Sequence, residues 1–359
     1  MSVVAGDKHF NMEEIMMNLI PMPRKLQEKE GSFLVTYRTY LAVEPSCAPL
    51  AARQALLFAD GIKKRLGFAL ELTRAAGRTG DIALRQDDSM EPEAYRLKIG
   101  ESGVCLTGSA RGLWHGMQTV LQLMTEYGAV LPALNIEDSP SLPNRGYYFD
   151  CTRGRVPKLE WLKALADRMA YYKLNQLQLY VEHTYLFRDL TELWRDDTPL
   201  TAAEIMELDR YCAERGVELV PSLSSFGHLY KLLSTREYCH LCELEGAEKQ
   251  PFSVRGRMQH HTVNVADPES LRLVEGMLAE YMELFTSRQF NFCADETFDL
   301  GRGRSKEYVE KRARTPHTSN SSAGSPALCW KRAAVRCSGA ILSAAFRSLS
   351  GNCRRRPSA

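Results

Sequence analysis

The chain has 359 residues, of which 44% are hydrophobic and 25% are charged, and its formal net charge is +2, so its composition is that of an ordinary globular protein with two or three domains. No segment approaches the roughly eighteen consecutive apolar residues of a membrane helix, and Asp7, Glu13 and Glu14 interrupt the N-terminal stretch where a secretory signal needs an unbroken apolar run. The ten cysteines are scattered instead of densely spaced, and we therefore expect a cytoplasmic protein with reduced thiols that binds no membrane.

Residues 20–140 follow an N-terminal extension of residues 1–19 and have the alternation of a small α/β domain. Extended segments are predicted at residues 32–43, at residues 80–86 and, as a β-hairpin around a Gly-containing turn, at residues 93–108. Helices are predicted at residues 48–67 and 109–128, the second with an apolar face of Leu113, Met117, Val120, Leu121 and Met124. No grouping of charged residues in this domain demands chemistry.

From Arg145 onward the sequence repeats a strand followed by a helix. The predicted strands are residues 145–150, 175–183, 217–224 and 290–296. The predicted helices are residues 157–173, 201–216 and 267–285. Thr201 with Glu204 has the spacing of a capping box, and Asp267 with Pro268 marks another helix start.

Such repeats predict parallel βα units, in either an open doubly wound sheet or part of a (β/α)₈ barrel. No Gly-rich phosphate loop follows the first strand, which disfavours a nucleotide-binding sheet. In a barrel, the functional side chains lie at the carboxyl ends of the strands. The strand ends here carry such residues, so we predict a site at that edge.

The segment "FNFCADETFDL" places Asp295 and Glu296 at the end of the fourth predicted strand. Successive residues of a regular strand point to opposite faces, so two adjacent carboxylates must do different jobs. One assignment makes Glu296 a general acid, because a neighbouring charge and partial burial both raise a carboxyl pKa, and gives Asp295 an orienting role. The alternative is a solvated strand end or a helix cap, which the pair alone favours.

The other strand-end residues have both functional and ordinary interpretations. Arg145 is either a surface charge or a guanidinium that binds sugar hydroxyls. His228 is a base, an orienting group or a hydrogen-bonded core histidine, and Glu182 and His183 are either site residues or exposed ones.

The sequence also offers two weak metal-binding patterns. The "CHLC" of Cys239 and Cys242 has no second cysteine pair at zinc-finger distance, and the neighbouring His260 and His261 form no fuller set. We therefore predict no metal and no other cofactor.

The last 49 residues differ from the rest of the chain. Residues 311–359 hold ten basic residues and no acidic one, whereas residues 1–310 hold 36 basic and 44 acidic residues. A basic arm for nucleic acid and a solvated tail are two interpretations. We favour a third, a shift of reading frame near residue 312, because three cysteines and a tryptophan are unusual in a basic arm. We therefore expect no nucleic-acid partner.

Taken in order, these segments resemble the family 20 glycoside hydrolases, the β-N-acetylhexosaminidases, over roughly residues 20–310. The resemblance rests on "PMPRKL" and "EAYRLKIGESGVCLTGSARGLWHGMQTVLQL" in the first domain. In the second it rests on "RGYYFDCTR", "MAYYKLNQLQLYVEH", "SFGH" and "FNFCADETFDLG". It implies an N-terminal non-catalytic α/β domain over residues 20–140, followed by a (β/α)₈ TIM-type barrel.

The resemblance also implies a mechanism, the removal of terminal N-acetylglucosamine or N-acetylgalactosamine with retention of configuration, in which the substrate's acetamide oxygen attacks the anomeric carbon. By position, Glu296 matches the acid/base, Asp295 the acetamide-orienting residue and His228 the histidine that supports the acid. Arg145 matches the residue that binds sugar hydroxyls. His183 stands where the family often has an Asp, with Glu182 beside it, and we expect both in the substrate-binding part of the site.

Residues 141–311 are expected to form only about the first four βα units of that barrel, since Arg145 to Glu310 spans about two thirds of the roughly 250 residues of a complete one. The basic tail, residues 312–359, is expected to be disordered or out of frame. We accordingly expect a truncated enzyme with little or no activity, or a glycan-binding fragment that does no chemistry. The sequence indicates no oligomeric state.

Overall fold

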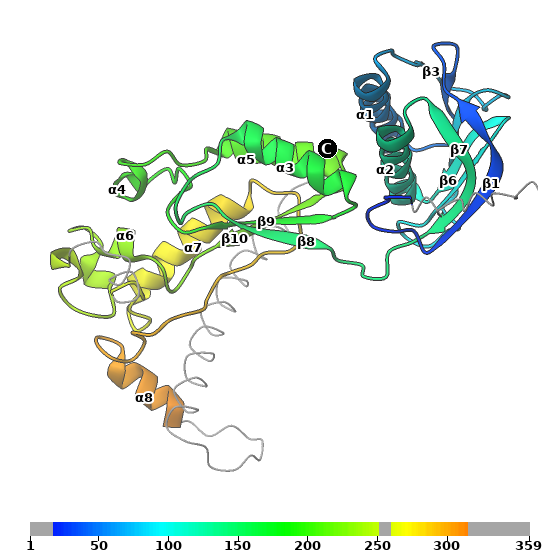
Figure 1. Cartoon of the computed structure of the whole chain (residues 1–359). Helices are drawn as coiled ribbons and strands as arrows, with labels where there is room; N and C mark the ends of the chain where they lie inside the picture. Colours follow the sequence, from blue (N-terminus) through cyan, green and yellow to red (C-terminus); the bar gives the residue numbers. More distant parts are fainter. Residues whose placement is uncertain (1–16, 251–259, 315–359) are drawn as a thin grey trace, which may run out of the picture. The chain divides into compact units, whose positions relative to one another are not determined.

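The computed structural model describes residues 17–250 and 260–314, and the chain forms two compact units (Figure 1). The first unit contains the residues up to Pro143 together with two short segments, residues 168–174 and 214–216. The second contains the other described residues from Asn144. The predicted tail after residue 311 therefore lies almost wholly outside the described residues.

The first unit is built on a seven-stranded mixed sheet with the strand order β1-β7-β5-β6-β4-β2-β3. Its strands are β1 (Lys25–Leu34), β2 (Tyr40–Val43), β3 (Glu71–Thr73), β4 (Ile82–Gln86), β5 (Tyr95–Gly100), β6 (Gly103–Gly108) and β7 (Val130–Asp138). The predicted hairpin is confirmed, because β5 and β6 pair antiparallel across a short turn. β3 and β7 were not predicted.

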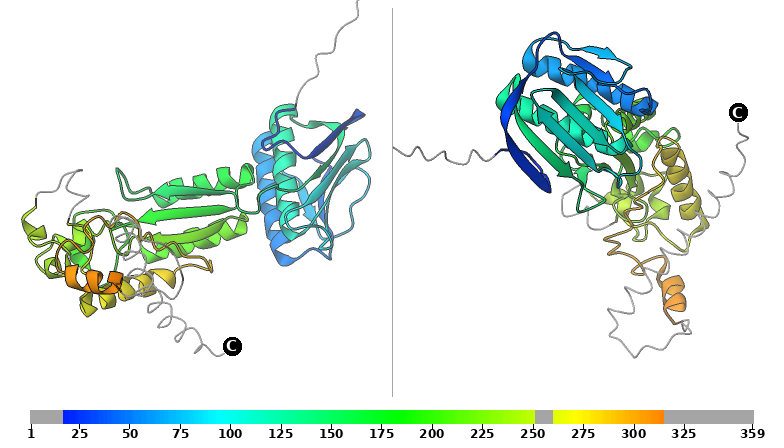
Figure 2. Two further views of the ribbon diagram at one scale, coloured as in Figure 1. Left: turned by 90° about the horizontal axis from the view of Figure 1, so that it is seen from below. Right: turned by 90° about the vertical axis from the view of Figure 1, so that its right-hand side faces the viewer.

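Two helices, α1 (Pro49–Leu66) and α2 (Ala110–Tyr127), pack on the same side of this sheet, as Figure 2 shows. The predicted apolar face of α2 is confirmed, since all five of its residues are buried. In β5, Tyr95, Leu97 and Ile99 are buried while the residues between them are not. One face of the sheet therefore forms the core with the helices.

The second unit contains a parallel sheet in the order β10-β9-β8, made of β8 (Gly146–Asp150), β9 (Gln176–Val181) and β10 (Glu218–Leu223). The longer helices are α3 (Leu159–Tyr171), α5 (Ala202–Glu214), α7 (Pro268–Met282) and α8 (Lys306–Arg314). The short ones are α4 (Thr191–Trp194), α6 (Tyr230–Leu233), η1 (Cys239–Leu241) and η2 (Ala247–Lys249). α3 and α5 lie along one face of the sheet (Figure 1).

The predicted helix starts are confirmed by their hydrogen bonds. The Thr201 hydroxyl accepts the Glu204 backbone N–H at 3.2 Å, and Glu204 Oε2 accepts the Thr201 N–H at 2.9 Å, which makes a complete capping box. Asp267 accepts the N–H of Glu269 at 2.9 Å ahead of Pro268. None of the described helices has the length and apolar character needed to span a membrane.

The fourth predicted strand, residues 290–296, is wrong in extent but right in place. Only Asn291 pairs with β10, as a parallel bridge to Ser222. Its N–H donates to the Pro221 carbonyl at 2.9 Å, and its carbonyl accepts the Leu223 N–H at 3.0 Å. The extended conformation ends early because Cys293 and Glu296 have left-handed backbones, with φ of 43° and 49°. The described residues thus form an α/β domain followed by a partial TIM-type barrel.

Candidate active site

Five of the six predicted site residues follow the carboxyl ends of neighbouring parallel strand segments. Glu182 and His183 come directly after β9, and His228 comes five residues after β10. Asp295 and Glu296 follow the bridge at Asn291, which runs parallel to β10. Because the strands are parallel, these residues gather at one edge of the sheet.

The centre of the cluster is the imidazole of His228, which lies between two carboxylates. Its Nε2 is 3.3 Å from Oε2 of Glu296, and its Nδ1 is 4.0 Å from Oε1 of Glu182. The His228 and Glu182 side chains are 8% and 1% exposed, whereas that of Glu296 is 44% exposed. The three residues therefore form a line from the protein interior to the solvent, with Glu296 at the open end.

Glu182 is held by groups that suit a buried anion. The Tyr180 hydroxyl donates to Oε1 at 3.0 Å, and Arg153 Nε lies 4.0 Å from the same oxygen. Burial, followed by the charge of Glu182, raises the pKa of the Tyr180 phenol far above its usual value, so this hydroxyl stays a hydrogen-bond donor. Ser224 in turn donates to the Tyr180 oxygen at 2.9 Å. The buried carboxylate is thereby fixed in orientation.

His183 lies on the other side of Glu182 and points to a residue that the sequence did not single out. Its Nδ1 is 3.8 Å from Glu182 Oε2, and its Nε2 is 3.6 Å from Oδ2 of Asp197. Lys231 donates to the same Asp197 oxygen at 3.0 Å. Although burial raises the pKa of Asp197, the hydrogen bonds from Lys231 and from the Thr198 backbone, together with the charge of Lys231, lower it below its usual value. Asp197 stands in a polar loop without a motif, so local sequence gave no signal for it.

Two of the site residues have an uncommon backbone conformation. His228 has a φ of 59° and Glu296 a φ of 49°, in the left-handed region that non-glycine residues seldom adopt. Such conformations cost on the order of 1 kcal/mol or more each and cluster at functional sites. The turn at Glu296 explains how adjacent carboxylates need not point to opposite faces. Ligand atoms of His228, Asp295 and Glu296 all lie within 4.8 Å of one another.

A close approach between two loops also belongs to the site. A side chain on Gly227 would place its Cβ 2.9 Å from the Asp295 carbonyl oxygen, closer than real Cβ atoms come to backbone. The glycine before His228 therefore lets the two loops meet. The "SFGH" motif contained this residue, but its role was visible only in the structure.

Arg145 lies at the opposite end of its strand. It precedes β8, and its backbone N–H donates to Oδ1 of Asn175, which itself precedes β9. The carboxyl end of β8 instead carries Asp150, which forms an ion pair with Arg153 at 2.6 Å. The structure thus gathers Glu182, His183, His228, Asp295 and Glu296 and places Arg145 at the amino-terminal end of the sheet.

Among the described residues, the spacing of His228, Asp295 and Glu296 is one that a cation could bridge, although a histidine beside carboxylates serves acid–base chemistry equally well. At the "CHLC" segment, burial raises the pKa of the Cys242 thiol to about 11, which disfavours the thiolate that a metal ligand requires. The absence of a metal cofactor stays a prediction.

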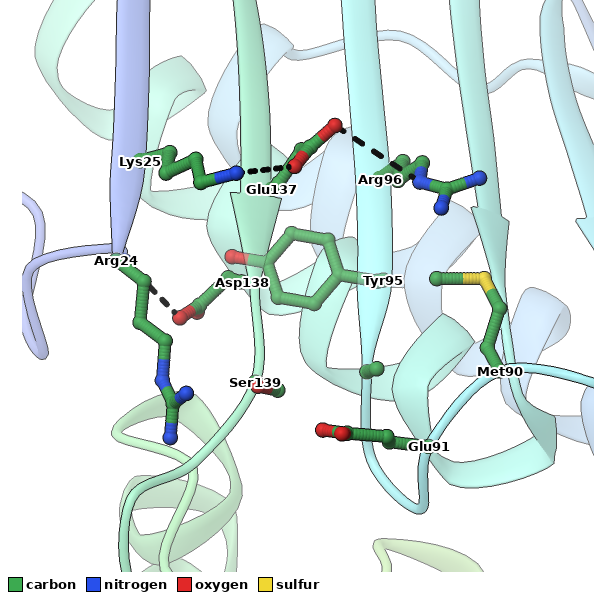
Figure 3. A pocket seen from close by; sticks show the side chains of 10 residues that line it. Arg24, Lys25, Met90, Glu91, Tyr95, Arg96, Glu137, Asp138 and Ser139 are labelled. Atoms are coloured by element: carbon green, nitrogen blue, oxygen red, sulfur yellow. Dashed lines mark hydrogen bonds and ion pairs between the residues drawn. The ribbon is translucent and has the colours of Figure 1, made fainter.

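A pocket of about 380 Å³ occurs in the first unit, where several of its charged groups are already paired (Figure 3). Glu137 lies 3.1 Å from Lys25 and 4.0 Å from Arg96, and Asp138 accepts the Arg24 backbone N–H at 3.3 Å. The Tyr95 ring between them is buried in the core. These groups balance one another, and we assign no chemistry to the pocket.

Comparison with known proteins relates both units to one family. Residues 16–139 match the family model described as glycosyl hydrolase family 20, domain 2, and residues 143–325 match that of the glycosyl hydrolase family 20 catalytic domain. A β-hexosaminidase of Vibrio furnissii is 27% identical over 314 residues, which cover 79% of this chain and 49% of that protein. A β-hexosaminidase of Porphyromonas gingivalis is 25% identical, with 78% of this chain and 39% of that protein covered. The chain spans about half the length or less of these relatives.

Solved structures of family 20 enzymes are similar to this chain. A Streptomyces plicatus β-hexosaminidase variant in complex with N-acetylglucosamine has a TM-score of 0.69 at 25% identity, covering 83% of this chain and 62% of that one. A family 20 exo-β-N-acetylglucosaminidase of Vibrio harveyi has a TM-score of 0.70 at 21% identity, covering 84% and 50% of the two chains, and shares the fold. With a catalytic-domain match over 143–325, just over half its length, the chain belongs to glycosyl hydrolase family 20.

Proposed function

We propose that this site removes terminal N-acetylhexosamine from glycosides by a retaining, substrate-assisted reaction. The observation that carries the proposal is the line Glu182, His228, Glu296, with Asp295 beside its solvent-exposed end. Membership of family 20 and the N-acetylglucosamine bound in related structures support the same substrate class.

In this proposal Glu296 is the general acid and base. Its exposed carboxyl group gives its proton to the glycosidic oxygen as the bond to the leaving group breaks, and it later takes a proton from the attacking water. His228 holds the acid through the 3.3 Å contact. Glu182, buried at the other ring nitrogen, balances the charge of an imidazolium when one forms. Glu182 thereby takes the place of the Asp expected from the family.

Asp295 acts on the acetamide in the same proposal. The acetamide oxygen attacks the anomeric carbon, so positive charge develops on the acetamide nitrogen, and a carboxylate beside the acid orients and stabilises it. No enzyme carboxylate needs to form a bond to the sugar. Arg145 precedes β8 at the other end of the sheet, and its proposed binding of sugar hydroxyls rests on the family resemblance alone. His183 is proposed to support the substrate-binding side of the cluster through Asp197.

The test is hydrolysis of chromogenic β-N-acetylglucosaminides and β-N-acetylgalactosaminides by the full chain. Glu296→Gln is expected to lower kcat by roughly 10²- to 10⁴-fold, because it removes the transferable proton. Glu283→Gln, which changes an exposed carboxylate after α7, is the matched control and keeps the native rate. Equal rates for Glu296→Gln and the native chain would contradict the assignment.

A second candidate is a glycan-binding fragment that uses the same cluster without chemistry. The observation that favours it is the extent of the barrel, since its sheet in the described residues consists of the parallel strands β8, β9 and β10 and the bridge from β10 to Asn291. This candidate is identified if the native chain binds N-acetylglucosamine, Asp295→Ala does not bind it, and no hydrolysis occurs at any pH. Hydrolysis that depends on Glu296 excludes it.

A further inference from the structure

A second histidine, His261, connects the two loops that carry His228 and Glu296. Its side chain is fully buried, and its Nδ1 accepts the backbone N–H of His228 at 2.8 Å. Its carbonyl oxygen accepts the next backbone N–H, that of Leu229, at 3.0 Å. Two consecutive amides at the left-handed turn of the His228 loop are thus fixed by one residue.

The segment that carries His261 is itself held on both sides. Val263 donates its N–H to the Phe226 carbonyl at 3.0 Å, and Asn264 donates to the Leu241 carbonyl at 2.7 Å. Cys242 forms an antiparallel bridge with Val263. The backbone around His261 is therefore held in place by hydrogen bonds on both sides. Through its hydrogen bond to the His228 N–H, His261 can in turn hold His228 in position.

The same residue also reaches the loop that follows Glu296. The ring of His261 lies beside that of Phe298, two residues after Glu296, with 6.3 Å between the ring centroids. Farther along, the buried Glu243 accepts the N–H groups of Gly303 at 2.9 Å and Ser305 at 3.2 Å. Glu243 itself donates its N–H to the Thr262 carbonyl at 2.9 Å, so the loop after Glu296 and the His228 loop both contact the segment that carries His261.

The hydrogen bond to His228 requires a neutral imidazole with a free lone pair on Nδ1. Burial, together with the neighbouring His228 and His260, lowers the pKa of His261 to about 4, so the ring is neutral near pH 7. The remaining proton is then on Nε2, which has no hydrogen-bond partner within residues 17–250 and 260–314. A buried N–H without a partner destabilises a fold, so stability alone does not account for a histidine here.

We infer that His261 is a positioning residue that holds the His228 imidazole against Glu296 by accepting the His228 backbone N–H. The inference rests on the proposed function, in which His228 supports the acid. Two of the three measurements that test it do not require hydrolysis, so the failure of one idea can be told from the failure of the other.

The variants differ in where they place a hydrogen-bond acceptor. His261→Phe keeps an aromatic ring and removes the acceptor, whereas His261→Asn carries an amide oxygen near the position of Nδ1. His261→Gln, whose acceptor lies near the position of Nε2, replaces His261→Phe if that variant does not fold. All are made in the full chain.

The first measurement is hydrogen exchange of the His228 amide by NMR, with Leu208 in α5 as the reference amide. Exchange at His228 is expected to be about tenfold faster in His261→Phe, the effect of losing one hydrogen bond, and close to native in His261→Asn. Unchanged exchange in His261→Phe or His261→Gln overturns the inference.

The second measurement is a double-mutant cycle of His228→Gln and Glu296→Gln in urea unfolding. The coupling free energy between the two substitutions is expected to fall in the His261→Phe background and to return in the His261→Asn background. If this coupling free energy is the same in all backgrounds, the hydrogen bond from His261 does not position His228, and the inference is overturned.

The third measurement is the kinetics of hydrolysis. His261→Phe is expected to lower kcat by roughly 10-fold or more with little change in KM, and His261→Asn to restore most of it. An unchanged kcat in His261→Phe overturns the inference. If the native chain does not hydrolyse the substrates, the proposed function fails, and exchange and coupling still decide whether His261 positions His228.

Discussion

Glu182 shows how burial determines what a carboxylate can do. It is 1% exposed and receives a hydrogen bond from Tyr180, with Arg153 at 4.0 Å. A carboxylate in that position is a fixed negative charge beside Nδ1 of His228 and is poorly placed to exchange protons with solvent. Its proposed contribution is therefore electrostatic.

Replacing Glu182 by Gln tests this contribution. The amide keeps the volume and can still accept from Tyr180, but it cannot balance an imidazolium at His228, so kcat is expected to fall roughly 100-fold or more. Steady-state kinetics across pH measures the change, and Glu283→Gln again serves as the control. A variant as active as the native chain would show that the charge of Glu182 does not contribute to the reaction.

His261 leads to a prediction about stability and pH. Its pKa is about 4 in the folded chain and about 6.5 when unfolded, so between these values the unfolded state binds more protons. The free energy of unfolding should therefore fall as pH drops from about 6.5 to about 4, by an amount on the order of 3 kcal/mol, and this group adds no further loss below pH 4. Urea unfolding of the native chain and of His261→Asn measures it. A slope of the same size in the variant contradicts the prediction.

At the scale of elements, the meeting of two loops depends on Gly227. Gly227→Ala puts a Cβ 2.9 Å from the Asp295 carbonyl, and since backbone must move, the free energy of unfolding is expected to fall by about 1–3 kcal/mol. Asp295 should shift with it and activity should drop.

Gly276 provides the matched control for that substitution. It lies inside α7, where a Cβ would meet nothing within 4 Å, so Gly276→Ala is expected to stabilise the chain by about 0.5–1 kcal/mol. Chemical denaturation compares the two variants. Equal effects of both would mean that the close approach at Gly227 does not constrain the loops.

The predictability of the elements followed the strength of their local signals. α5 and α7 were located from the Thr201–Glu204 box and the Asp267–Pro268 start, because caps are local interactions. β7 was missed although it lies between β1 and β5. Its Pro132 interrupts the strand signal, and the β1–β7 register shifts between Glu28 and Ser32 opposite this region.

The clustering of five predicted residues followed from their order along the chain, whereas the position of Arg145 and the geometry of the cluster did not. Order along the chain identified Glu182, His183, His228, Asp295 and Glu296, and parallel strands brought them together. The end of the fourth strand was misjudged because left-handed residues at 293 and 296 carry no signature when they are Cys and Glu. Asp197 and His261 were missed as site residues because their roles come from contacts between segments far apart in sequence.

At the scale of the molecule, the partial barrel leaves one side of β8 without a partner strand among the described residues. Tyr147 and Tyr148 on this strand are each 47% exposed. Unpaired strands with apolar side chains favour association between chains. The cytoplasmic location and the origin of the basic tail stay predictions.

Tyr147→Lys tests the consequence of this open edge. A charged side chain on an edge strand opposes pairing, so the variant should associate less than the native chain at equal concentration. Sedimentation and light scattering measure the difference, with Tyr37→Lys, another exposed tyrosine but in the first unit, as the control. Native chains that stay monomeric at high concentration would contradict the expectation.

The order of Glu182, His228 and Glu296 along the chain also determines when the site can form during synthesis. Glu182 precedes His228 by 46 residues and Glu296 follows it by 68, so the interior carboxylate leaves the ribosome long before the proposed acid. The contact between the rings of His261 and Phe298 forms only after that last loop has been made. The nascent chain thus contains Glu182 first and the proposed proton donor, Glu296, last, so the line of three residues is complete only once Glu296 has been made.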